Sequence, residues 1–142
     1  MAQTNQILSK TKKIKLDFKE SKYATGRRKR SIAKVWVKKG TGNIHVNGLK
    51  MNEYFKRPVH QIIVTRPLEI SEVTSDYDVK CSVKGGGLSG QAGAIILGIS
   101  KALILLDENL KKNLKKDKLT TRDSRVVERK KYGHRKARRS FQ

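Results

Sequence analysis

Hydrophobic and polar positions alternate in residues 32–38 and again in residues 79–83, which is the pattern of half-buried β-strands. The glycine-containing segment 39–43 reads as a loop, and Ile44 and Val46 follow it with the spacing of a returning strand. The sequence therefore predicts that residues 32–38 and 44–46 form a β-hairpin.

The part of the chain between these strands has a weaker pattern. Asn47-Gly48 is a strong turn signal, and the apolar residues of 51–55 have the spacing of a short helix. Residues 59–64 stay largely apolar, and the following Pro67 favours a break in the chain. Residues 68–73 then predict a weak strand.

A clear helical period begins after the three glycines at 85–87. Apolar residues recur every 3.6 positions from 89 to 106, which predicts the principal helix, with Ser89 as its N-cap. Leu110 and Leu114 predict a second, Lys-rich helix.

These elements indicate one α+β domain, a two-layer sandwich of a mainly antiparallel sheet with helices on one face. Three parts are expected: a Lys-rich N-terminal extension over 1–22, a core over 23–118, and an extended basic tail over 119–142, where periodicity is lost. Within the core, regular structure is expected to begin after Gly26.

The charge of the chain is concentrated at its two ends. Residues 1–39 contain 13 Lys or Arg and 2 acids, residues 108–142 contain 14 and 4, and the 68 residues between them contain 7 and 6. Clustered positive charge repels itself unless solvent or a polyanion lies against it. A polyanionic partner is therefore the first inference.

The composition of the chain and its first residues indicate the kind of compartment in which the protein works. The single cysteine, Cys81, excludes an intrachain disulfide and fits a reducing compartment. The apolar stretches fall short of the ~20 residues that span a bilayer, so no membrane partner is expected. The first residues lack the apolar core of a secretion signal, and residues 1–26 contain two acids and no Arg, which fits a mitochondrial presequence poorly.

Residues 85–90 match the G-x-G-x-x-G pattern of dinucleotide sites. Such a site needs a parallel βαβ unit with an acid about 20 residues on, at the end of the next strand, whereas Asp107 and Glu108 fall at a helix end. A P-loop fails because Gln91 stands where lysine is required. A nucleotide-dependent enzyme is thus the weakest interpretation. The glycines favour a tight turn with close helix–sheet packing, and the N–H groups at the helix start remain an option for an RNA phosphate.

The histidines suggest no catalytic or metal site. His45, His60 and His134 lie at no metal-ligand spacing from Cys81 or from one another. No nucleophile, base and orienting group can be assembled from neighbouring residues. We therefore expect a protein that is not an enzyme, with no catalytic residues, no metal and no cofactor.

Two basic runs point to nucleic acid. Residues 27–30 are four consecutive cations, and residues 128–139 hold seven more. Arginine forks suit bidentate phosphate contact, while Tyr132 and Gly133 offer a stacking face and a flexible joint. Structured RNA is favoured over regular DNA; the alternative is a free, non-specific nucleic-acid-binding protein that compacts DNA.

Five segments form a pattern when they are taken in order: YATGRRK at 23–29, VNG at 46–48, YF at 54–55, VKGGGLSGQAGA at 83–94 and LTTRDSRVVERKKYG at 119–133. Together they resemble ribosomal protein S9 (uS9) of the bacterial type, over roughly residues 23–142. The resemblance implies an S5 domain 2-like fold in the head of the small ribosomal subunit. It also implies a tail that threads through ribosomal RNA toward the peptidyl-site tRNA.

The same resemblance implies partners and site residues. The partners are small-subunit ribosomal RNA, peptidyl-site tRNA and neighbouring ribosomal proteins of the head. The residues implied in ribosomal RNA binding are Arg27, Arg28, Lys29, Arg30, Arg122, Arg125, Arg129, Lys130, Lys131, Tyr132, Arg135 and Lys136. Those implied near the tRNA are Arg138, Arg139, Ser140, Phe141 and Gln142.

The tail departs from the bacterial pattern at its end. Bacterial members usually run to a terminal Ser-Lys-Arg whose last arginine approaches the tRNA, whereas this sequence ends in Arg-Arg-Ser-Phe-Gln. If this end is native, the tRNA contact is expected to be weakened, moved to Arg139 or lost. Residues 121–133 and 138–142 look closer to alphaproteobacterial and mitochondrial members than to chloroplast ones, so a mitochondrial ribosome is slightly favoured over a bacterial cytoplasm.

Overall fold

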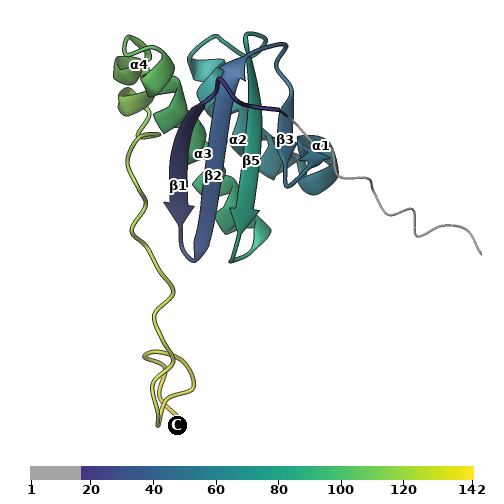
Figure 1. Ribbon diagram of the computed structural model, residues 1–142. Helices are drawn as coiled ribbons and strands as arrows, with labels where there is room; N and C mark the ends of the chain where they lie inside the picture. The colour runs from purple at the N-terminus through teal and green to yellow at the C-terminus, as the bar shows by residue number, and fades with distance from the viewer. Residues whose placement is uncertain (1–16) are drawn as a thin grey trace, which may run out of the picture.

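The computed structural model describes residues 17–142, and a five-stranded sheet backed by helices forms its centre (Figure 1). The sheet order is β1-β2-β5-β3-β4, with three antiparallel neighbours and one parallel pair, β3 with β5. The fold is α+β. The elements are β1 (Lys22–Arg28), β2 (Ser31–Lys39), β3 (Ile44–Val46), β4 (Leu49–Lys50), α1 (Met51–Tyr54), α2 (Pro58–Ile70), β5 (Tyr77–Lys84), α3 (Leu88–Leu106) and α4 (Leu110–Lys116).

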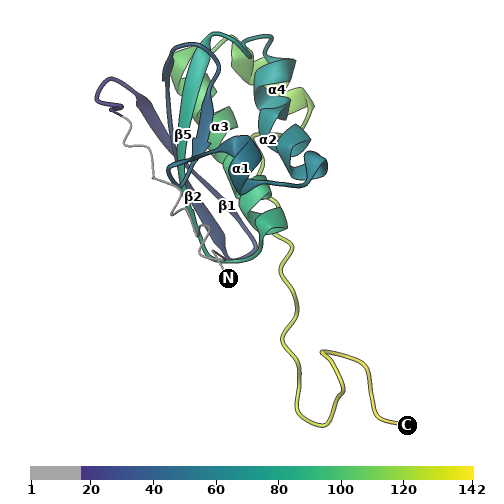
Figure 2. The same cartoon turned by 90° about the vertical axis from the view of Figure 1, so that its right-hand side faces the viewer.

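Helices α2 and α3 cover one face of the sheet (Figure 2). The alternation predicted for residues 32–38 is confirmed, because Ala33, Val35 and Val37 are fully buried against the helices. The strand predicted at 79–83 is confirmed in the same way by β5. The three predicted helices are present as α1, α3 and α4.

The predicted hairpin between residues 32–38 and 44–46 is wrong. β2 pairs with β1 and β5, while β3 pairs in parallel with β5. One reason lies in Asn47, whose amide oxygen accepts from the Val83 N–H at 2.8 Å and whose amide nitrogen donates to the Val83 carbonyl at 3.1 Å. These two hydrogen bonds add to the backbone hydrogen bond from the Asn47 N–H to the Cys81 carbonyl at 2.9 Å and fix the end of β3 to β5.

Regular structure begins four residues before Gly26, so the prediction that it starts after this glycine is also wrong. Gly26 lies within β1, and a Cβ there would overlap the Ala94 carbonyl of α3. Glycine thus lets the edge strand approach the helix backbone closely, at a position that was expected to precede the regular structure.

The region around Pro67 differs from the prediction as well. α2 runs through this proline to Ile70, and residues 68–73 form no strand. Proline lacks one helical N–H, but Pro67 and Leu68 are buried in the core, and this packing outweighs the local cost. At the start of α3 the N-cap is Gly87 and not Ser89, which lies inside the first turn.

By length and composition alone, helix α3 is long and apolar enough to cross a membrane, with a mean hydropathy of 1.6. This differs from the expectation that the apolar stretches of the chain are too short to span a bilayer. The helix is nevertheless mostly buried between the sheet and α2. Burial of most of its residues accounts for this composition, as expected of a core helix.

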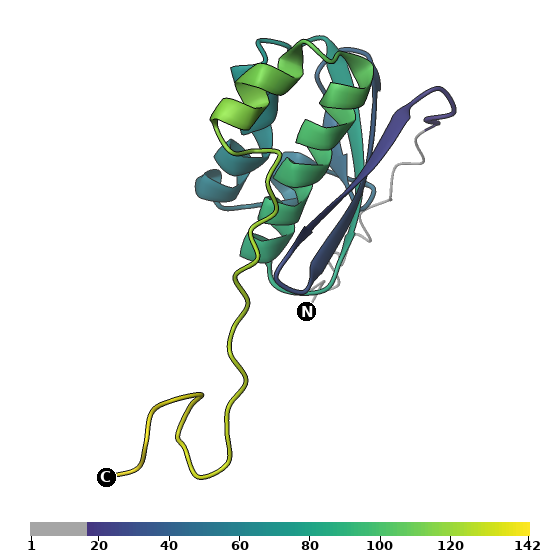
Figure 3. The same cartoon turned by 90° about the vertical axis from the view of Figure 1, so that its left-hand side faces the viewer.

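The chain leaves the core after α4 and runs past α3 (Figure 3). Leu119 is buried and ends this connection. From residue 122 to residue 131 the backbone forms no helix or strand, so this part extends away from the domain.

Candidate nucleic-acid interface

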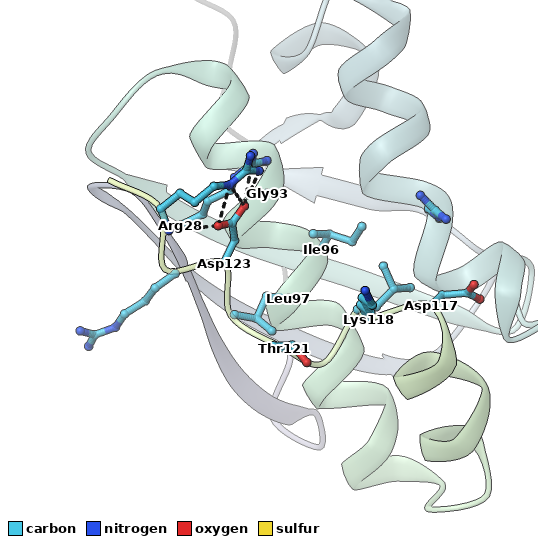
Figure 4. Close-up of a pocket in the computed structure, with 12 residues that line it drawn as sticks. Arg28, Gly93, Ile96, Leu97, Asp117, Lys118, Thr121 and Asp123 are labelled. Carbon is cyan, nitrogen blue, oxygen red and sulfur yellow. Dashed lines mark hydrogen bonds and ion pairs between the residues drawn. The ribbon is translucent and has the colours of Figure 1, made fainter. Parts of the chain in front are cut away.

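An open pocket of about 460 Å³ lies where the tail leaves the core (Figure 4). Its walls come from β1, α2, α3 and residues 117–125. It is lined by Arg27, Arg28, Arg66, Gly93, Ile96, Leu97, Asp117, Lys118, Leu119, Thr121, Asp123 and Arg125. Five cationic and two acidic residues line the pocket, so it keeps a positive balance suited to an anion such as a phosphate.

Arg28 enters this pocket across the surface of α3. A Cβ on Gly93 would overlap Cδ of the Arg28 side chain and lie 2.8 Å from its Nη1. The glycine therefore leaves the space in which the arginine lies. Because β1 packs closely on α3, Arg28 of β1 lies within reach of Asp123 of the tail.

Asp123 joins the tail to this arginine. Its Oδ2 lies 2.7 Å from Arg125 Nη2 and 3.8 Å from Arg28 Nη2. Its Oδ1 accepts from the Arg125 backbone N–H at 3.0 Å. The hydrogen bonds from Arg125 hold the pKa of Asp123 well below its usual range, with a smaller contribution from the charge of Arg28, and the same carboxylate raises the pKa of Arg125. Asp123 is therefore a fixed negative charge between two arginines.

A second hollow, of about 260 Å³, lies beside the first and shares this ion pair. Lys29 lines it together with Val126 and Val127. The structure thus brings Arg27, Arg28 and Lys29 close to Arg125 of the tail. Arg30 lies in the exposed turn between β1 and β2 and Arg122 is exposed in the tail, and neither lines these hollows.

The far end of the tail folds back on itself. Glu128 accepts from Arg138 Nε at 3.0 Å and lies 3.9 Å from Lys131 Nζ. A backbone bridge joins His134 to Ser140, and the Arg135 guanidinium lies 5.6 Å from the centre of the Phe141 ring. The Tyr132 side chain is 95% exposed. Arg129, Lys130, Lys136, Arg139 and Gln142 are exposed along the same end.

The glycines at 85–90 form a packing turn. The Gly85 carbonyl accepts from Ser31 Oγ at 3.0 Å and from Gln91 Nε2 at 3.1 Å, and a Cβ on Gly86 would overlap Ser31 Oγ. β5 is antiparallel to β2, and no strand follows α3 within residues 17–142. The parallel unit that a dinucleotide site requires is therefore missing from the described chain.

Two cations of the pocket were not predicted from the sequence. Arg66 comes from α2 and Lys118 from the turn after α4. Neither lies in one of the basic runs that marked a candidate site. Both join the pocket only because the fold brings four distant segments together. Asp123 gave a local signal, since it is an acid two positions before Arg125 in a basic run, but its link to Arg28 has no trace in the sequence.

Residues 26–142 match the family model of ribosomal protein S9/S16. The chain belongs to this family. As an S9/S16 protein it is a structural constituent of the small ribosomal subunit, where it binds ribosomal RNA and has other ribosomal proteins as partners. The residues that line the positive pocket and the glycine turn both lie within the matched region.

Proposed function

We propose that residues 119–142 of this S9/S16 protein form a reaching tail, with ribosomal RNA bound along residues 122–136 and the peptidyl-site tRNA met by residues 138–142. The observation that supports this most is exposure. From residue 122 to residue 130 every residue except Asp123 is exposed, and none belongs to a helix or strand. A cationic segment in this form can follow an irregular phosphate backbone.

The root of the tail supports the same role. Leu119 is 7% exposed, and the Arg28–Asp123 contact at 3.8 Å follows it closely. This arrangement holds the first tail residues beside the basic residues of β1. RNA bound at the pocket would be continuous with RNA bound along the tail.

Several finer assignments accompany this proposal. The core is of the S5 domain 2-like kind, and the protein works without enzymatic activity or a cofactor. The residues implied in RNA and tRNA contact by the family resemblance keep those roles. Residues 121–133 and 138–142 favour the alphaproteobacterial and mitochondrial type, and a mitochondrial ribosome slightly over a bacterial one.

Reconstituted small subunits test the tRNA part of the proposal. The variant Arg138→Ala/Arg139→Ala should assemble, because neither side chain belongs to the core, and should retain peptidyl-site tRNA several-fold less well. Its matched control, Lys111→Ala/Lys112→Ala, removes the same charge from exposed positions of α4 and should retain tRNA normally. Equal tRNA retention by both variants and the unchanged protein would refute tail contact with the tRNA.

A further inference from the structure

The face of the sheet opposite α2 and α3 carries a row of side chains across all five strands. The strand register places Tyr23 of β1, Trp36 of β2, Lys80 of β5, His45 of β3 and Lys50 of β4 side by side. Each is exposed or half-buried. The buried residues of the same strands, such as Val35 and Cys81, face the helices instead.

We call this face, which α2 and α3 do not cover, the open sheet face. Aromatic rings form its centre. The Tyr23 and Trp36 rings lie 5.2 Å apart between centroids and are tilted by 43°, and Tyr23 is 45% exposed. Phe18, just before β1, lies on the same face, with Lys38 Nζ at 4.6 Å and Lys80 Nζ at 5.9 Å from its ring centroid. Lys80 Nζ also lies 5.4 Å from the Trp36 ring. Three rings and two ammonium groups therefore share one surface.

Cations surround these rings along the strands. The register puts Lys34 opposite Ser82, and Ile32 between Arg27 and Lys84. Ile32, Lys34, Ser82 and Lys84 line a hollow of about 170 Å³. Asp78 is the acid of this face among the paired strand residues, and its carboxylate accepts from the N–H groups of Thr41 and Asn43.

This composition suits RNA better than protein. Protein interfaces are depleted in lysine at their centres, whereas proteins that bind unpaired nucleic acid combine aromatic stacking platforms with cations that follow the phosphates. An exposed sheet with aromatic residues on adjacent strands is one known form of such a platform.

We propose that the open sheet face is a second RNA-binding surface, which takes unpaired nucleotides by stacking on Tyr23 and Trp36 and holds their phosphates at Lys34 and Lys84. It extends the RNA binding of the family to a surface apart from the tail. It holds whether or not the tail reaches the tRNA.

The fluorescence of Trp36 tests this directly, because it is the single tryptophan of the chain. The full-length protein is titrated with a single-stranded oligouridylate of about eight nucleotides, within the usual site size of such surfaces. Stacking should quench Trp36 emission in a saturable way. A heparin fragment, which carries anionic groups but no bases, should bind the basic chain without the same quenching. Absence of quenching by the oligonucleotide, or equal quenching by both ligands, would overturn the proposal.

Variants separate stacking from charge. Trp36→Ala should weaken binding of a labelled oligonucleotide by roughly five- to a hundredfold, the range for one stacked base, and Trp36→Phe should recover most of it. Lys34→Ala/Lys84→Ala leaves the buried core untouched and should lower the salt dependence of binding by about 0.7 for each phosphate that these lysines neutralise. The control Lys111→Ala/Lys112→Ala should leave Trp36 quenching unchanged. Unchanged quenching and affinity in the Lys34/Lys84 variant would contradict the proposal.

The tail variant keeps the two proposals apart. Arg138→Ala/Arg139→Ala should preserve Trp36 quenching even if tRNA retention falls. If Trp36 instead cross-links to another ribosomal protein in assembled subunits, and not to RNA, the open sheet face is a protein interface and the RNA proposal fails.

Discussion

Arg28 lies in the space that a side chain on Gly93 would need. A Cβ at residue 93 would overlap Arg28 Cδ, so a strand cation depends on a helix glycine for its position over α3. The two residues are 65 positions apart in the sequence. The position of a cation that lines the basic pocket therefore depends on how β1 packs on α3.

Gly93→Ala should displace Arg28 with little change in the stability of the core. Alanine gains up to about 1 kcal/mol of helix propensity, which offsets the displacement of a flexible side chain. Binding of ribosomal RNA fragments should weaken several-fold, while the free energy of unfolding, measured by urea denaturation, changes by less than about 1 kcal/mol. The comparison variant Gly98→Ala should lower stability by about 1–3 kcal/mol, because its Cβ would meet Val35 Cγ2 in the core. Unchanged RNA affinity of Gly93→Ala would contradict the role given to Arg28.

Asp123 should stay ionised well below the usual pH for an aspartate. Its folded-state pKa is lowered by Arg125 first, so its contribution to stability is present above the unfolded pKa of about 3.9 and is lost as pH falls through the lower folded value. The chemical shift of the Asp123 carboxyl carbon, followed by NMR during acid titration, measures this. Arg125→Ala should move the midpoint back toward about 3.9. A midpoint already near that value in the unchanged protein would show that the Asp123–Arg125 fork does not persist in solution.

Cys81 should be inert toward thiol reagents while the protein is folded. The side chain is 2% exposed, and burial raises the pKa of its thiol far above the ordinary value, so almost no reactive thiolate forms. Labelling with a thiol-specific reagent should follow global unfolding and speed up with added denaturant. Fast labelling in native buffer would indicate that β5 opens locally.

Asn47 should be important for stability. Asn47→Ala removes both hydrogen bonds to Val83 and places alanine at a φ of 51°, so a loss of about 2–4 kcal/mol in unfolding free energy is expected. Asn47→Gly is the matched variant, since glycine adopts this φ without strain. It should be about 1 kcal/mol more stable than the alanine variant. Thermal melting of both proteins checks the order, and the reverse order would show that backbone strain is unimportant here.

The sequence predicted the elements that have a regular apolar period. The strand at 79–83 and the long helix after the glycines were found because burial on one side imposes that period. The pairing of residues 44–46 was missed, because the Asn47–Val83 hydrogen bonds join positions 36 apart and leave no local signal. Pro67 misled for a related reason, since tertiary burial overrode a local rule.

The candidate site, too, could be predicted only where its signal is local in the sequence. The basic runs at 27–30 and 128–139 were visible because charge density is a local property. Arg66, Lys118 and the bridging role of Asp123 were not, because they meet only after β1, α2 and the tail have packed on α3. The Tyr23–Trp36 pair on the open sheet face was hidden as well, since regular structure was expected to begin only after Gly26 and the strand that carries Tyr23 was therefore not predicted.

The fold-back at the end of the tail stores length. Glu128 holds Arg138 at 3.0 Å, so the residues between them form a loop and not a line. Straightened at ~3.3–3.6 Å per residue, those ten steps would add roughly 30 Å to the distance the tail can cover. An RNA phosphate that replaced Glu128 as the partner of Arg138 would open this loop. The distance that the tail spans would then depend on whether RNA is bound.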